Sequence, residues 1–185
     1  MTDIRDVIAA ERLELAEILV GLPAKAWDAP SLCEGWRVRE VVAHMTAPYR
    51  HPDAEFLRAE DADELNRAAD ELARLDAGQL TSTELTAAVR DNARHPWQPD
   101  GFTGALCHDV IHGLDITVAL GLGRQVPLDR LRIVLDTIVP DRAAFFGVDL
   151  TGKRLVATDL DWSNGDGEPV TRPAQELVLL VCGRT

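Results

Sequence analysis

The segment SLCEGWRVREVVAHM, residues 31–45, places a histidine inside an amphipathic helix. Its valines and Met45 recur at helical spacing and form one apolar stripe, and His44 lies at the edge of that stripe. An ionisable ring that faces the interior of a helical bundle needs a polar partner. The partner of His44 is therefore a backbone carbonyl, an acidic side chain or a metal ion.

A second segment, CHDVIHGLDI at residues 107–116, also has the pattern of a helix and contains His108 and His112. Residues four apart on a helix lie one above the other, so these two imidazoles could ligate a single metal ion. Ala105 on the same stripe and Gly104 close by are small, which would leave room for an ion, water or substrate. The alternative is that both histidines are polar surface residues or hydrogen-bonded core residues.

Asp115 follows His112 by one helical turn. Its carboxylate is placed to accept a hydrogen bond from the ring nitrogen that faces away from the metal, which would fix the tautomer of the histidine. The alternatives for Asp115 are a solvated acid or a hydrogen bond in helix packing. With His44 as a third ligand, the site would be three imidazoles with an open coordination position, as in catalytic rather than structural zinc sites.

The remaining candidate ligands fit a metal site less well. His51 and His95 each precede a proline, a pairing typical of exposed loops. Cys33 has the setting of a small buried residue, although a thiolate would be a soft metal ligand. Cys107 points about 100° away from His108 on the helix.

Around these segments the chain is mainly helical. A small tail, residues 148–185, follows a helical domain at residues 1–147; its turn sequence NGDG predicts a β-hairpin with the return strand EPVT, before a short apolar helix. Capping boxes at residues 61–64 and 81–84 open two of the helices, and Pro48 is expected to bend or end another. The pattern predicts helices at about residues 3–20, 37–45, 61–75, 81–94, 103–120 and 128–139.

Composition limits the classes of partner. The 185 residues carry a formal net charge of −12, and such an acidic chain repels phosphate backbones and anionic lipid, so we expect no nucleic-acid or membrane partner. No apolar run has the length of a membrane span, and the charged N-terminus lacks a signal-peptide core. Three widely spaced cysteines fit the reducing cytoplasm. A homodimer would be ordinary for a bundle of this size.

Residues 31–45 resemble the segment "small-x-C-x-GW-x-V-x-[DE]-V-x-x-H", which opens the second helix in a group of the DinB/YfiT-like metal-dependent family. That actinobacterial group contains the N-terminal domain of mycothiol-dependent maleylpyruvate isomerase. The pattern H-x-x-x-H-x-x-D of His108, His112 and Asp115 resembles the second metal segment of the group. Residues 157–184 resemble the closing segment of many of its members. The isomerase has a glutamate where His108 stands in this chain.

The resemblance implies a DinB-like four-helix bundle and a divalent metal ion held by His44, His108 and His112. Three imidazoles suit zinc, nickel, iron or copper, and of these we expect zinc. The resemblance implies mycothiol or a similar low-molecular-weight thiol as cosubstrate. The metal would present the thiol as a thiolate nucleophile, for transfer to a small electrophile or for its isomerisation. The sequence alone names no general base.

Two other functions stay open at the level of sequence. The chain could be a non-enzymatic metal-binding or ligand-binding module of the DinB-like type. It could also be a scaffold or dimerisation protein in which the histidines are buried structural residues. Metal content and thiol-dependent turnover distinguish these functions.

Overall fold

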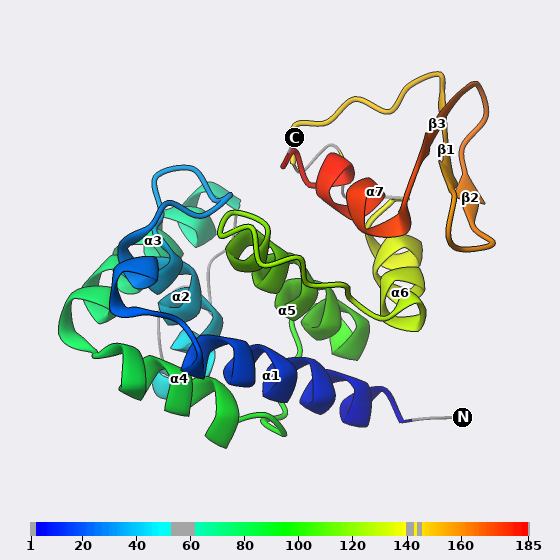
Figure 1. Ribbon diagram of the computed structural model, residues 1–185. Coiled ribbons are helices and arrows are strands. Elements are labelled where there is room, and N and C mark those ends of the chain that lie inside the picture. The colour runs from blue at the N-terminus through cyan, green and yellow to red at the C-terminus, as the bar shows by residue number, and fades with distance from the viewer. Residues whose placement is uncertain (1–2, 53–61, 140–142, 144–145, 185) are drawn as a thin grey trace.

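The computed structural model describes residues 3–52, 62–139, 143 and 146–184. The architecture is mainly helical with a small C-terminal region of strands and a helix, as the sequence predicts (Figure 1). The elements in chain order are α1 Ile4–Val20, the 3-10 helix η1 Ala24–Asp28, α2 Val38–Arg50, α3 Ala62–Gln79, α4 Ser82–Asp91, α5 Gly101–Thr117, α6 Leu128–Ile138, β1 Lys153–Ala157, β2 Ser163–Asn164, β3 Glu168–Arg172 and α7 Ala174–Val181.

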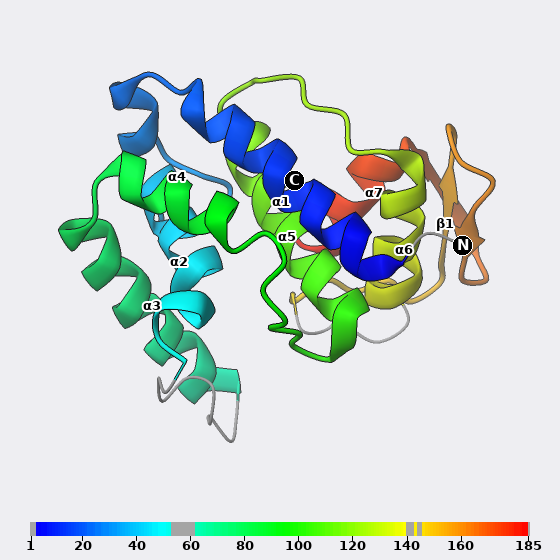
Figure 2. The ribbon, with the colours of Figure 1, turned by 90° about the horizontal axis from the view of Figure 1, so that it is seen from below.

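Four of the helices form a closed ring of contacts. Helix α1 packs against α4 and α5, and α2 packs against the same two helices, which makes the four-helix bundle (Figures 1 and 2). Helix α3 packs against α2, and α6 packs against α5. One apolar cluster fills the space among α1, α2, α4 and the end of α5, and a second joins α5 to α6, α7 and β1. Helix α5 therefore belongs to both halves of the interior.

Local signals fix several helix ends. The side chain of Thr81 accepts a hydrogen bond from the Glu84 amide, and the Glu84 carboxylate accepts one from the Thr81 amide, so the predicted capping box at residues 81–84 is confirmed. The box predicted at residues 61–64 includes a residue outside the described part of the chain. Helix α3 continues to Gln79, beyond the predicted end near residue 75.

Proline 48 does not end helix α2, which continues for two more residues. A proline in the last turn removes only one backbone donor. The Arg50 guanidinium donates to the carbonyl oxygen of Ala43 at 2.8 Å and adds a hydrogen bond to the turn before the proline. The helix ends at Arg50 because His51 precedes Pro52, and a residue before proline avoids the helical conformation.

The strands pair differently from the sequence prediction. The antiparallel hairpin is made by β1 and the two-residue β2, whereas β3, expected as the return strand, pairs with β1 in parallel. The NGDG turn carries the chain across the start of β1 to its other edge. A Cβ on Gly165 would lie 2.4 Å from the carbonyl oxygen of Lys153, and one on Gly167 would lie 2.2 Å from that of Gly152. Only glycine permits this crossing.

Helix α7 closes the tail against the bundle. Its buried residues Leu177, Val178 and Val181 join the apolar cluster of α5 and α6. The division of the chain near residue 147 stays a prediction. Among the described helices, none combines the length and the hydropathy that crossing a bilayer requires.

Candidate metal centre

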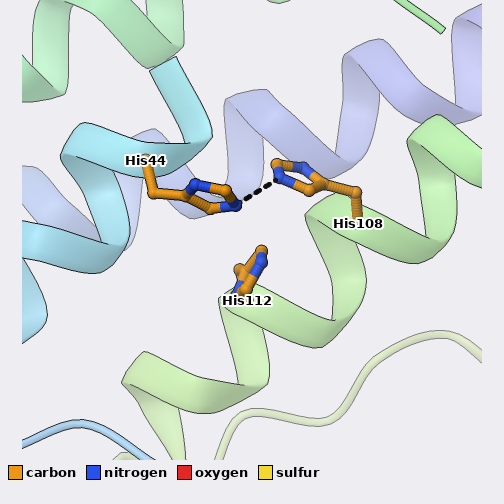
Figure 3. Close-up of side chains that lie close together, drawn as sticks. All are labelled: His44, His108 and His112. Atoms are coloured by element: carbon orange, nitrogen blue, oxygen red, sulfur yellow. Dashed lines mark hydrogen bonds between the residues drawn. The ribbon is translucent and has the colours of Figure 1, made fainter. Parts of the chain in front are cut away.

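Three histidine side chains meet between helices α2 and α5. His44 projects from α2, His108 and His112 project from successive turns of α5, and one potential ligand nitrogen from each lies within 4.8 Å of the other two (Figure 3). The Nε2 atoms of His44 and His108 are 3.2 Å apart. In a tetrahedral zinc site with Zn–N bonds near 2.05 Å, neighbouring nitrogens are about 3.3 Å apart. The spacing of this pair therefore suits a shared metal ion.

The first α5 histidine is held by a buried ion pair. Nδ1 of His108 lies 3.0 Å from one carboxylate oxygen of Asp109, and the Nε–H of Arg12 donates to the other oxygen at 2.6 Å. Asp109 and Arg12 are each 1% exposed. Because an ionised carboxylate can only accept, the His108 proton is on Nδ1 and the Nε2 lone pair faces His44. Arg12 extends from α1, so this pair also joins α1 to α5.

His112, the second histidine of α5, also has a carboxylate at its Nδ1 atom. Nδ1 of His112 lies 2.9 Å from Oδ2 of Asp115, which is fully buried, and Arg184 donates to Oδ1 of Asp115 at 3.0 Å. Burial alone would raise the pKa of Asp115, but the His112 hydrogen bond and the Arg184 ion pair outweigh it and lower the pKa to about 2. Nε2 is thus the ligand atom that His112 retains.

Cysteine 33 lies on the Nδ1 side of this histidine. Its thiol donates to Oδ2 of Asp115 at 2.9 Å, and its sulfur is 3.8 Å from Nδ1 of His112. Burial and the Asp115 carboxylate raise the pKa of Cys33, so its thiol stays protonated. Cys33, His112 and Asp115 thus have ligand atoms close together, but hydrogen bonds among them already occupy these atoms.

The α2 histidine is placed by packing. Its ring lies against the indole of Trp36, with 5.1 Å between the ring centroids. Desolvation lowers the pKa of His44 well below its usual value, and the neighbouring His112 and His108 lower it further. Desolvation also lowers the pKa of His108, although Asp109 opposes the shift. Both rings are therefore neutral at pH 7, the form that binds a metal ion.

The centre is reachable from solvent. The side chains of His108 and His112 remain 14% and 15% exposed. A half-buried tryptophan flanks the group on each of two sides, since Trp36 contacts His44 and the Trp97 ring meets His108 edge-on at 4.9 Å. The histidines therefore lie at a partly exposed position beside two aromatic rings.

The structure brings together the four residues selected from the sequence, namely His44, His108, His112 and Asp115. Of the other candidates, only Cys33 lies beside these four residues. Nε2 of His51 is 2.9 Å from Asp76, the His95 ring contacts that of Tyr49 at a tilt, and Cys107 is buried in the core.

The interpretation of Gly104 as space for a ligand is wrong. A Cβ there would lie 2.0 Å from the carbonyl oxygen of Pro99, so the glycine permits close packing of the loop before α5.

Sequence reasoning missed Asp109, Arg12 and Arg184. Arg12 did leave a signal, because it occupies the buried stripe of α1 between Ile8 and Leu15, where a charged residue needs a partner. Asp109 is adjacent to His108, and neighbouring helical side chains point about 100° apart, so their contact is not evident from spacing. The pairing of Arg184 depends on how the tail packs.

The chain is similar to known proteins in sequence and in fold. The family model for the mycothiol maleylpyruvate isomerase N-terminal domain matches residues 8–116, a segment that includes all three histidines. Two solved structures are similar over 100% of this chain and 93% of theirs, with a TM-score of 0.54 and 16% identity. They are crystal structures of the mycothiol-dependent maleylpyruvate isomerase and of a histidine-to-alanine mutant of it. No curated protein matches. This chain belongs to the mycothiol maleylpyruvate isomerase N-terminal domain family.

Proposed function

We propose that the protein is a metal-dependent enzyme that activates a low-molecular-weight thiol for reaction with a small electrophile. One observation carries the proposal: three imidazoles converge, and two of them are held at Nδ1 by buried carboxylates that each pair with an arginine. Metal-binding histidines have this arrangement, with the second ring nitrogen bonded to a carboxylate.

The donor set fits a divalent metal ion. His44, His108 and His112 would hold it, and three protein ligands leave a position for a small molecule, as in catalytic zinc sites. Imidazole ligands suit zinc, nickel and iron, and of these we expect zinc. The ion would lower the pKa of a bound thiol and so supply a thiolate at neutral pH.

The chain itself orients the ligands and balances their charge. Asp109 and Asp115 keep the proton on Nδ1, and Arg12 and Arg184 neutralise the two carboxylates. The centre therefore gains rigid lone pairs without gaining negative charge. A neutral ligand set leaves the full positive charge of the metal ion to act on the thiol.

The reaction class follows from the thiol. In a transfer, the sulfur forms a bond to an electrophilic carbon, and the leaving group departs with the bonding electrons. In an isomerisation, the sulfur adds to a carbon–carbon double bond conjugated to a carbonyl group, the new single bond rotates, and the sulfur is expelled again. Membership of the family and the mycothiol dependence of the similar isomerase support mycothiol as the thiol. A cytoplasmic location and a homodimer stay predictions.

Metal analysis and turnover together test the proposal. Protein purified without a histidine tag should contain about one metal ion per chain, and chelation should lower its melting temperature. Metal-loaded protein should consume mycothiol in the presence of an electrophile, and His112→Ala should abolish this turnover. Metal binding without turnover across a panel of electrophiles would favour the non-enzymatic module, and no bound metal would refute both the proposed enzyme and a metal-binding module.

A further inference from the structure

A cavity of about 360 Å³ lies behind one wall of the metal centre. It is formed by the first turn of α1, the loop between α4 and α5, and the start of α5. Trp97 lines it, and the same ring contacts His108. None of the three histidines of the metal centre lines this space. Its size is within the usual range for ligand sites, roughly 300–1,000 Å³.

The charged groups of the cavity balance one another. Arg5 pairs with Asp3 at 2.6 Å, and Arg94 pairs with Asp6 at 2.9 Å. Two cations and two anions give no net attraction for a phosphate or an amine. Arg94 nevertheless has N–H donors beyond the one that Asp6 accepts, and a carboxylate has lone pairs to spare. Such a lining suits a neutral ligand with many hydroxyl groups.

Aromatic rings complete the lining. Trp97 and Phe102 border the cavity, and their apolar faces suit the C–H face of a sugar ring. His108 follows Phe102 by six positions on α5, about 9 Å along the helix axis. A thiol that carries one or two sugar-like rings could therefore reach the histidines with its sulfur while the rings occupy the cavity.

We propose that this cavity binds a neutral, polyhydroxylated, sugar-like ligand, and that this ligand is the non-reacting part of the thiol cosubstrate. The identification of this ligand as part of the thiol rests on the proposed function, whereas the binding of a sugar-like ligand in the cavity does not. Trp97 then separates the two subsites and contacts both. The cavity would explain how the protein selects a glycosylated thiol over free cysteine.

Calorimetry on metal-free protein tests whether the cavity binds a neutral, sugar-like ligand. The probe is the pseudodisaccharide of mycothiol with an acetyl group in place of its cysteine, which keeps the sugar-like rings and leaves the molecule uncharged. The double variant Asp6→Ala/Arg94→Ala removes one ion pair without changing net charge, and Arg90→Ala/Asp91→Ala is the matched control on α4, away from the cavity. We expect the cavity variant to weaken binding about ten-fold or more. The control should bind like the unmodified protein, and both variants should keep its melting temperature within about 4 °C. No binding to the unmodified protein, or equal loss in both variants, overturns the inference.

Turnover by metal-loaded protein tests whether the ligand of the cavity is the non-reacting part of the thiol. With mycothiol, the cavity variant should raise KM about ten-fold, and with N-acetylcysteine, which lacks the rings, KM should not change. An equal effect on both thiols refutes the assignment of the cavity to the thiol while the proposed function stands. If neither thiol reacts but the pseudodisaccharide binds, the proposed function fails and the sugar site stands.

Discussion

Arg12 and Asp109 form a buried ion pair, and breaking it should lower the stability of the protein. Both side chains are 1% exposed and 2.6 Å apart, so removal of either leaves an unpaired charge in the interior. Breaking such a pair costs about 3–5 kcal/mol in the free energy of unfolding. For a chain of this length, each kcal/mol lowers the melting temperature by roughly 2–4 °C. Arg12→Met or Asp109→Asn should therefore lower it by about 6–20 °C.

The double variant separates the pair from its surroundings. Arg12 also donates to the carbonyl oxygens of Asn92, Ala93 and His95 at 3.1–3.4 Å, and these bonds are lost whenever Arg12 is replaced. Arg12→Met/Asp109→Asn leaves no unpaired charge, so it should be more stable than the sum of the single changes implies, by about 1–3 kcal/mol.

Urea unfolding of the chelated protein, followed by circular dichroism, measures these differences. The matched control is the pair of Arg94 and Asp6, which also joins α1 to the segment after α4 but is 75% and 52% exposed. Its loss should cost at most about 1 kcal/mol. If the buried single variants also lose less than about 1 kcal/mol, or if their effects simply add, the reasoning about this pair is refuted.

Three further predictions concern the centre. Asp115→Asn should weaken metal binding about 10–100-fold in a competition titration, because His112 loses the carboxylate that orients it; unchanged affinity would contradict this role. Cys33→Ser should change the metal affinity by less than about three-fold, because the sulfur lies on the Nδ1 side of His112, away from the metal-binding nitrogen. Loss of metal in this variant would show that Cys33 is a ligand. The metal-free protein should lose stability as the pH falls below about 6.5, because His44 and His108 have lowered pKa values when folded and the unfolded chain then binds more protons. His44→Gln should show a smaller loss in urea titrations between pH 7 and pH 5, and an equal loss would exclude His44 as the source.

The sequence predicts those parts of the molecule that depend on neighbours along the chain. The helical spacing of His108 and His112, the capping box at Thr81 and the start of α6 after Pro127 are all local patterns, and the structure has each of them. The meeting of His44 with the other two histidines is a tertiary contact. The place of His44 at the edge of an apolar stripe left a metal ion as one of three possible partners, and the resemblance to a known family selected that one.

What the sequence does not predict depends on packing between distant segments. Strand β3 pairs with β1 in parallel and not as the expected antiparallel return strand, because two glycines let the chain cross over the start of β1. A turn motif alone does not say along which edge of β1 the next strand lies. The carboxylate partners Arg12 and Arg184 come from α1 and from the segment after α7, 97 and 69 residues from their aspartates. No periodicity within one helix reveals such pairs.

The ligands are divided unequally between two helices, and this has a mechanical consequence. Helix α5 carries two of the three histidines together with both supporting aspartates, whereas α2 contributes His44 alone. A bound ion would therefore act as a clasp that fastens α2 to α5. Because α3 packs against α2, the bound ion would also restrict the movement of α2 and α3 together relative to the rest of the bundle.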